Sequence, residues 1–440
     1  MQKSQQTIVF IAAWLGWGFD IFDGLLFNFV APNCVPTLLG LEIGSQAAKA
    51  ATLNWTGILT AVLLLGWAAG GVIFGLVADR IGRSKTLLIT MLFYALGTAA
   101  CAFVPNIWLL LLCRTFASLG IGGEWAAGAA LVAEAVPEKR RVEAGALLYT
   151  SAPFGIFLAT FVNAQIAGNL FKNQPEVSWR YVFLCGLIPA ALAIAIRFLV
   201  KEPESFTERA ANFKAPQLSE LFTPALWPAT RSGLGLAVVA LLTWWSCNAF
   251  IPVVASTLAQ TAAKTQGLNV AQTSGLMESW KTLASESFNW GGLLGTLLTV
   301  PIAKSVGRRP MFAIYFIGSA IALFATFATD LPPETRLRMY FFIGLTVFGI
   351  FGSFTYYLPE LYPQRLRSTG SGFCYNIGRV VAAIGLFVVG SIAAGAKGDI
   401  SIILRVLSSI GFIPLLGLFL MPWTIETRTY ALTKRSLCGL

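Results

Sequence analysis

The chain has 440 residues, of which 56% are hydrophobic and only 12% are charged, and its mean hydropathy is +0.72. A soluble domain does not need so much apolar surface, so we expect an integral protein of the cell (inner or plasma) membrane. A lipid-embedded backbone must satisfy its own hydrogen bonds, which leaves helical bundles or closed barrels. Barrels alternate weakly over ten-residue segments, whereas this chain has continuous apolar runs, which favour a helical bundle.

Each of these apolar runs is about 20 residues long, the length that crosses a bilayer as a helix. The sequence therefore predicts an all-α membrane protein with twelve transmembrane helices. In chain order the predicted helices cover about 7–30, 54–78, 87–104, 108–133, 144–170, 179–200, 231–256, 282–303, 311–329, 338–358, 371–394 and 402–423.

Lysine and arginine are distributed unevenly between the two sides of this predicted bundle. The N-terminus, the even-numbered gaps and the C-terminal tail hold more of them than the odd-numbered gaps. Such an excess marks the cytoplasmic face, so both termini are predicted to be cytoplasmic. Because the basic residues are scattered over short loops, the net charge of +11 does not indicate a nucleic-acid partner.

The composition also limits the chemistry that is available. The chain has no histidine, and its seven cysteines are scattered singly without metal or disulfide spacing. We therefore expect no metal and no cofactor. Any proton chemistry must use carboxylates.

The first predicted helix contains two acids in "GWGFDIFDGL", Asp20 and Asp23. A charge inside the membrane costs a few kcal/mol, so it is a functional hypothesis by default. Asp20 lies about 20 Å deep at 1.5 Å per residue, and a pair at i, i+3 shares one helix face. Two such carboxylates resist ionising together in a low-dielectric cavity. This is the property that a proton carrier needs.

The fourth predicted helix supplies a counter-charge. Arg114 lies about 9 Å from the outer end of that helix, at a depth close to that of Asp23. In the coupling interpretation, Arg114 holds the charged Asp23, and protonation frees Arg114 and permits rocking between outward and inward states. In the alternative, a static ion pair pins helices one and four together. Glu124, near the middle of helix four, either joins the proton pathway or packs against a neighbouring helix.

The eleventh predicted helix contains Arg379 with no acid nearby on the same helix. A planar guanidinium suits bidentate recognition of a carboxylate, so Arg379 is the leading candidate for binding an anionic substrate. Tyr375 and Asn376 lie one turn below it. The alternative is that Arg379 extends to the inner headgroups.

Polar and aromatic residues in other helices extend the candidate binding site. On helix seven, Trp244, Trp245 and Asn248 form a cluster that could stack a ring or a sugar face and bond its hydroxyls, although such aromatic residues also serve packing. Further candidates that could face a cavity are Asn163, Gln165, Asn289 and Tyr356.

The longest cytoplasmic gap divides the runs six and six. It is rich in charge and proline and begins with "KEPES". We predict an N-terminal bundle over 1–200, a linker over 201–230, and a C-terminal bundle with its tail over 231–440.

Corresponding gaps in the two halves carry similar residues. "GLVADRIGRSK" follows run two and "PIAKSVGRRP" follows run eight. "EAVPEKRR" follows run four and "ELYPQRLR" follows run ten. Such internal repetition is typical of transporters built from two related bundles.

These motifs resemble the major facilitator superfamily over nearly the whole chain. "GLVADRIGRSK" matches the loop signature Gly-x-x-x-Asp-Arg-x-Gly-Arg. "RTFASLGIGGEW" resembles the fourth helix of the metabolite:proton and sialic-acid:proton symporters. The first helix resembles the sialic-acid and aromatic-acid symporters, with Asp-Ile-Phe-Asp in place of their Asp-Gly-Phe-Asp.

The resemblance implies salt bridges between cytoplasmic helix ends that hold the outward-open state and break when the inside opens. The alternative is that these charges only determine topology. The residues concerned are Asp79, Arg80, Arg83, Glu134, Arg141, Glu360 and Arg367.

The sequence thus predicts a monomeric, proton-coupled symporter that imports a small organic anion, such as a monocarboxylate, an aromatic acid or an acidic sugar, by alternating access. A sugar or polyol symporter is the nearest alternative, because "KEPES" and the helix-one aspartate also occur in sugar porters. A facilitator or exporter of the same fold is a further alternative. An enzyme is disfavoured, because no nucleophile–base or metal constellation is present.

Overall fold

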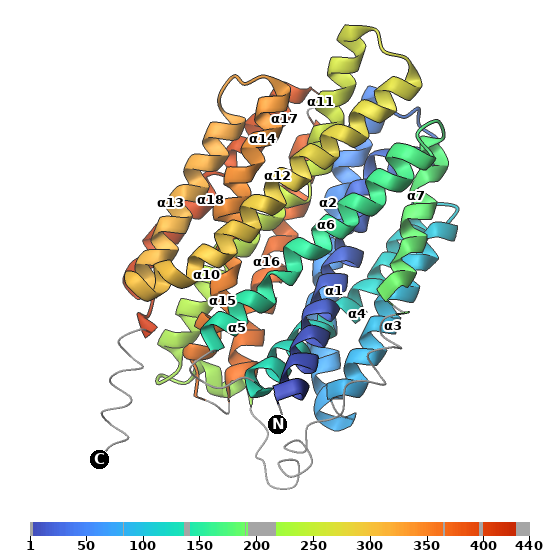
Figure 1. Ribbon diagram of the computed structural model, residues 1–440. Helices are drawn as coiled ribbons and strands as arrows, with labels where there is room; N and C mark the ends of the chain where they lie inside the picture. Colours follow the sequence, from blue (N-terminus) through green and yellow to red (C-terminus); the bar gives the residue numbers. More distant parts are fainter. Residues whose placement is uncertain are drawn as a thin grey trace, which may run out of the picture.

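The computed structural model describes the backbone of residues 3–81, 83–135, 141–189, 191, 217–363, 366–395 and 399–427. Some side chains inside these ranges, among them 78–84 and 123–142, are outside the description. Within the described ranges the chain is helical and has no strand, which confirms the all-α prediction. Figure 1 shows an elongated bundle that begins at its lower end with Lys3. We call the opposite end the upper end.

We divide the helices into two consecutive groups at residues 192–216, which lie outside the described residues. The group from residue 3 to 191, here called the N-half, contains α1 (Lys3–Leu38), α2 (Gln46–Ile81), α3 (Arg83–Ala100), η1 (Cys101–Phe103), α4 (Ile107–Ala135), α5 (Arg141–Tyr149), α6 (Ser151–Asn163), η3 (Ala164–Leu170), α7 (Pro175–Leu184) and η4 (Cys185–Leu187). The group from 217 to 427, the C-half, contains η5 (Leu218–Phe222), α10 (Trp227–Asn248), α11 (Ile251–Gln266), α12 (Val270–Ser305), α13 (Arg308–Phe327), α14 (Pro333–Ile343), η6 (Gly344–Phe348), α15 (Phe351–Glu360), α16 (Arg367–Gly395), α17 (Ile400–Ser409), α18 (Phe412–Phe419) and η8 (Met421–Trp423).

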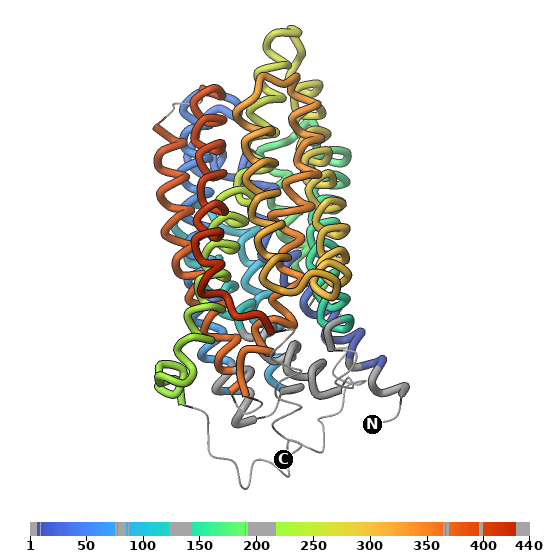
Figure 2. The backbone as a smooth tube through the Cα atoms, turned by 90° about the vertical axis from the view of Figure 1, so that its left-hand side faces the viewer, coloured from blue at the N-terminus to red at the C-terminus, as the bar shows by residue number. Residues whose placement is uncertain are grey.

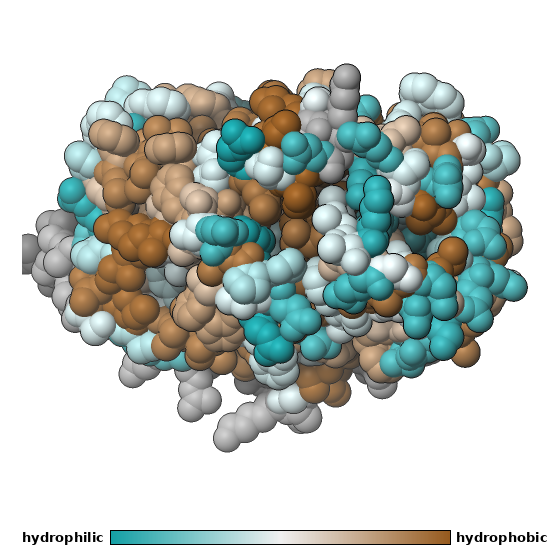
Figure 3. Space-filling model, turned by 90° about the horizontal axis from the view of Figure 1, so that it is seen from above, coloured by the Kyte–Doolittle hydropathy of each residue, from teal (hydrophilic) through white to brown (hydrophobic). Residues whose placement is uncertain are grey.

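The outer surface of the bundle suits a bilayer. Among the described residues, 8 helical stretches are long and apolar enough to cross a membrane, and two shorter apolar helices accompany them. Large apolar side chains such as Val72, Phe161 and Ile384 are at least half exposed on this surface. The upper face, by contrast, carries hydrophilic residues across its centre (Figure 3). The count of twelve helices and the cytoplasmic termini stay predictions.

Three helix breaks have a common cause in proline. Proline has no N–H to donate to the carbonyl four residues earlier, and its ring clashes with that carbonyl. Pro153 stands four residues after Tyr149, where α5 ends, and Pro252 stands four residues after Asn248, where α10 ends. Pro414 has the same relation to Ile410, at the break between α17 and α18.

The connection between α11 and α12 is shorter than the sequence predicted. The predicted gap 257–281 is largely helical, and α12 begins at Val270 rather than near 282. Gly267 ends α11 with a left-handed φ of 65°, as glycine permits. Asn269 and Gln272 then form a capping box that starts α12. The ends of both helices rise above the rest of the bundle (Figures 1 and 2).

Within each half, glycine lets two helices approach each other closely. In the N-half, a Cβ on Gly122 would lie 1.9 Å from the Trp67 carbonyl oxygen, so α4 rests directly on the backbone of α2. In the C-half, a Cβ on Gly291 would lie 1.9 Å from the Phe341 carbonyl oxygen, which places α12 on α14 in the same way. Small residues allow such backbone contact in membranes.

The two halves meet along a seam that runs the length of the bundle. Across it α2 packs against α16, α1 against α11, α6 against α12, and α5 against α12 and α15. Figure 1 shows α6 and α12 side by side along much of their length. The candidate site lies on this seam.

Candidate functional site

Arg114 lies against α1 at the level predicted, but it binds the backbone. Its Nη1 donates to the Asp23 carbonyl at 3.0 Å and its Nη2 donates to the Gly24 carbonyl at 2.6 Å. The side chain is 1% exposed. A carbonyl oxygen has two lone pairs, so these oxygens accept from Arg114 in addition to their helical partners. Arg114 therefore fastens α4 to α1.

The carboxylate of Asp23 is close to this guanidinium without bonding it. Arg114 attracts the carboxylate electrostatically, yet neither carboxylate oxygen makes a hydrogen bond to a described residue. The salt bridge expected between the two side chains is thus not formed in this structure. A Cβ on Gly186 of η4 would lie 3.1 Å from Asp23 Oδ1. Asp23, Arg114 and Gly186 all belong to the N-half.

Asp20, one turn earlier on α1, interacts electrostatically with the other half. Its carboxylate attracts the guanidinium of Arg379 on α16, which is 4% exposed. The two acids are separated by about 60° around the helix axis, which lets them face different neighbours. The sequence predicted that the two acids share one helix face and that Arg114 is the partner of Asp23; in the structure Arg114 attracts Asp23, whereas Asp20 attracts Arg379.

Arg379 is held between aromatic rings at the seam. Its Cζ lies 4.4 Å from the Trp67 ring centroid and 4.8 Å from the Tyr375 ring centroid. Its Nη1 donates to Asn376 Oδ1 at 3.0 Å, while its Nε has no partner among the described residues. Tyr375 and Asn376 therefore lie beside Arg379 as predicted. Since the guanidinium is enclosed between rings, it does not extend to the headgroups.

The tryptophans predicted on helix seven join the same aromatic cluster. Trp245 meets Trp67 edge to face across the seam, with ring centroids 5.6 Å apart. Trp244 contacts Trp245 and Phe351. Tyr149 of the N-half stacks on Phe351 at 6.1 Å and 13°. Trp67 and Tyr149 were not predicted, because their meeting with α16 and α15 depends on how the halves dock.

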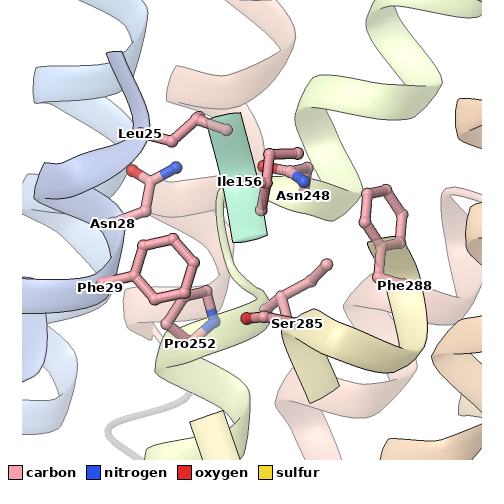
Figure 4. Close-up of a pocket in the computed structure, with 9 residues that line it drawn as sticks. Leu25, Asn28, Phe29, Ile156, Asn248, Pro252, Ser285 and Phe288 are labelled. Atoms are coloured by element: carbon pink, nitrogen blue, oxygen red, sulfur yellow. The ribbon is translucent and has the colours of Figure 1, made fainter. Parts of the chain in front are cut away.

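A small cavity lined by residues of both halves also lies at the seam (Figure 4). Its volume is about 10 Å³, which is room for about one water molecule. Asn248, predicted as a ligand, lines it together with Asn28 and Ser285. Asn289 is fully buried, and neither atom of its amide is hydrogen-bonded within the described part of the chain. The halves are therefore closed around the centre in this structure.

Three other predicted ligands lie away from this centre. Asn163 donates to Glu278 Oε2 at 2.7 Å near the upper end. Gln165 is exposed and accepts a hydrogen bond from Asn169, so it faces away from the seam. Tyr356 lies at the lower end, where its ring is 5.7 Å from the guanidinium of Arg308. Helical position alone does not decide which face of a helix meets the other half.

An ion pair near the upper end of α12 was missed. Lys281 Nζ lies 2.7 Å from Glu278 Oε1, and the side chains are 0% and 4% exposed. Both residues fall in the gap 257–281 between two predicted helices. Their opposite charges at i, i+3 are the helix signal that would have identified them.

At the lower end, one predicted gating residue forms an ion pair. Glu360 accepts from Arg308 Nη2 at 2.9 Å and from its Nε at 3.3 Å. Lys304 of α12 and Glu143 of α5 form an exposed ion pair across the seam. The side chains of the remaining predicted gating residues, and of Glu124, lie outside the described residues; the gating residues are Asp79, Arg80, Arg83, Glu134, Arg141 and Arg367.

Comparison with known proteins places this geometry in a family. The model of the Major Facilitator Superfamily matches residues 13–386. A relative from Cupriavidus pinatubonensis, named "Probable 4-methylmuconolactone transporter", is 29% identical over 97% of this chain and 92% of its own length. The gentisate transporter of Corynebacterium glutamicum is 25% identical over 88% of this chain and 82% of its own length.

A solved structure has the same fold. The D-xylose-proton symporter superposes with a TM-score of 0.72 at 17% identity, over 96% of this chain and 99% of that chain. The names of these relatives are those of transporters and not of enzymes. The chain is an integral membrane protein, and it belongs to the major facilitator superfamily of transporters.

Proposed function

We propose that this protein is a monomeric, proton-coupled symporter that imports a small organic anion by alternating access, with its lower end in the cytoplasm. The observation that carries the proposal is the buried guanidinium of Arg379 at the seam. Burying a charge is costly unless it is paired. Here two rings, one amide and the carboxylate of Asp20 offset that cost, and the free Nε–H is left to receive an anion.

The surroundings of Arg379 favour an acid with a flat apolar body. The Trp67 ring lies beside the guanidinium, Trp245 packs against Trp67, and Trp244 packs against Trp245. The indole N–H groups of Trp67 and Trp244 are buried without a partner among the described residues. Indole N–H groups normally find a partner when buried. Relatives named for 4-methylmuconolactone and gentisate transport support an organic acid.

Proton coupling follows if Asp20 and the substrate compete for the same arginine. A charged Asp20 neutralises Arg379 while the site is empty. When Asp20 takes up a proton, Arg379 becomes available to the carboxylate of the substrate. One proton then enters with each negative charge, so the closed site stays neutral and avoids the cost of an unpaired buried charge.

The first experiment measures the thermal stability of the purified protein with benzoate, glucuronate and xylose. A ligand that binds the folded state raises its apparent stability by mass action. We expect benzoate to stabilise the wild type and to lose its effect in Arg379→Ala. Arg405→Ala, which removes an exposed arginine on α17, is the matched control and should respond like the wild type.

The other outcomes of this experiment are also informative. Stabilisation by xylose in all three proteins would replace the organic anion with a neutral sugar. Stabilisation by benzoate that persists in Arg379→Ala would remove Arg379 from the binding site.

A further inference from the structure

The buried ion pair of α12 is joined to the N-half by three hydrogen bonds. Asn33 Nδ2 of α1 donates to Glu278 Oε1 at 3.3 Å, and Asn163 Nδ2 of α6 donates to Glu278 Oε2 at 2.7 Å. Lys281 Nζ donates to the carbonyl of Phe29 on α1 at 3.0 Å. Both amides and the ammonium are at most a few per cent exposed. These side chains, here called the upper cluster, therefore bridge the seam.

The charges of the upper cluster belong to one helix. Glu278 and Lys281 both lie on α12, so the ion pair moves with the C-half, whereas every other partner moves with the N-half. If the halves part at the upper end, the three bridging hydrogen bonds break together and the ion pair stays intact. An ion pair that becomes exposed to water costs little. Separation therefore leaves no unpaired charge in either half.

The upper cluster also stands directly above the central cavity. Ser285, which lines that cavity together with Phe29, lies one helical turn below Lys281. Phe29 belongs to both features, because its carbonyl accepts from Lys281. A Cβ on Gly168 of η3 would lie 3.2 Å from Glu278 Cβ, so the N-half backbone closes tightly over α12. The upper cluster thus separates the cavity from the upper face.

We propose that Asn33, Asn163, Glu278 and Lys281 are positioning residues of the transport cycle and form its upper gate. The gate closes when the two amides and the Phe29 carbonyl of the N-half dock on the neutral ion pair of α12. It opens when these three contacts break. The inference rests on the alternating access proposed above, but not on the identity of the anion.

The test measures how fast a cysteine at Ser285 reacts with a membrane-impermeant maleimide. Ser285→Cys is combined with Asn163→Ala, and right-side-out and inside-out membrane vesicles are compared. The reaction of the native cysteines is subtracted with the same proteins that lack Ser285→Cys. Gln165→Ala is the matched control, because Gln165 lies two residues away and its side chain bonds only Asn169 among the described residues.

We expect Asn163→Ala to raise the labelling rate about tenfold in one vesicle orientation only, and Gln165→Ala to leave it unchanged. A tenfold change corresponds to about 1.4 kcal/mol, which is within reach of one hydrogen bond to a charged group. Equal labelling in Asn163→Ala and Gln165→Ala would overturn the gate. So would a rise of equal size in both vesicle orientations, which reports general loosening of the fold.

A second variant tests the gate without leaving an unpaired charge that could cause misfolding. Glu278→Gln combined with Lys281→Met removes both charges together and leaves no unpaired one, so the protein should still elute as a folded species. It should show the same one-sided rise in labelling. Labelling needs neither substrate nor a proton gradient. A wrong assignment of the anion or of proton coupling would therefore leave this result unchanged, whereas a wrong assignment of the gate would not.

Discussion

Arg114→Met is expected to weaken the attachment of α4 to α1. The guanidinium makes hydrogen bonds of 3.0 and 2.6 Å to the carbonyls of Asp23 and Gly24. A hydrogen bond from a charged group contributes about 1.5–3 kcal/mol, so the loss of two should lower the free energy of unfolding by about 3–6 kcal/mol. Arg114→Lys keeps the charge but reaches fewer acceptors, because an ammonium lacks the planar fork. It should lose about half as much.

The same variants decide whether Asp23 is charged in the folded protein. Arg114→Met removes the cation that attracts the Asp23 carboxylate, and adding Asp23→Asn removes the charge left behind. If the carboxylate is ionised, the double variant should lose less free energy of unfolding than the two single variants lose together, by about 1–3 kcal/mol. Denaturant unfolding in detergent, followed by tryptophan fluorescence, measures the wild type, Arg114→Met, Asp23→Asn and the double variant. Losses that add to within about 0.5 kcal/mol would refute the electrostatic link.

Three further predictions test the helix contacts and ends. Gly122→Ala should lower the thermal midpoint, because its Cβ would fall 1.9 Å from a carbonyl oxygen of α2, whereas Gly372→Ala has open space and should not; a fluorescence melt compares them. Glu360→Gln should lower the midpoint more than Glu143→Gln, because the Glu143 ion pair is the more exposed of the two and an exposed pair contributes little. Asp399 caps α17, and hydrogen bonds from Ser401 hold the pKa of its carboxyl below the usual value. The cap is therefore complete above the ordinary pKa and is lost as the pH falls through the lower folded-state pKa. After correction for the intrinsic pH dependence of exchange, the protection of amides in the first turn should fall on acidification in the wild type but show no such pH step in Asp399→Asn.

The positions of the helices could be predicted where apolar character alone decides them. The run at 108–133 corresponds to α4, Ile107–Ala135, and the run at 311–329 corresponds to α13, Arg308–Phe327. The start of α12 could not be predicted in this way, because its first turns carry Glu278 and Lys281. Their charges resemble a loop in a hydropathy pattern, and only their docking on the N-half buries them.

The sequence predicted which types of residue form the candidate site, but not which residues of the two halves contact one another. Arg379 and its neighbours on α16 follow from helical spacing, and the structure confirms that they lie together. The contact of Arg379 with Trp67, by contrast, joins residues from different halves. No local pattern encodes such a contact, because it depends on how the N-half and the C-half pack against each other.

This dependence on docking separates the roles of the two helix-one acids. A group couples a proton to a conformational change only if its energy differs between the two states. The Asp23 carboxylate faces Arg114 and Gly186, and all three belong to the N-half and move together. The Asp20 carboxylate attracts Arg379 across the seam, so its electrostatic surroundings change whenever the halves part. We therefore expect Asp20, rather than Asp23, to carry the transported proton.

Uptake into proteoliposomes tests this assignment, with [14C]benzoate as the substrate and an imposed pH gradient. Asp20→Asn should abolish accumulation against a gradient while retaining benzoate exchange, because a neutral Asn leaves Arg379 free at every pH. Asp23→Asn is the matched variant one turn away, and it should still accumulate benzoate. Accumulation that survives in Asp20→Asn and fails in Asp23→Asn would reverse the assignment and return proton coupling to the Asp23–Arg114 pair. Because both carboxylates are fully buried, a general cost of burial cannot produce that difference, and only the half that each acid faces distinguishes them.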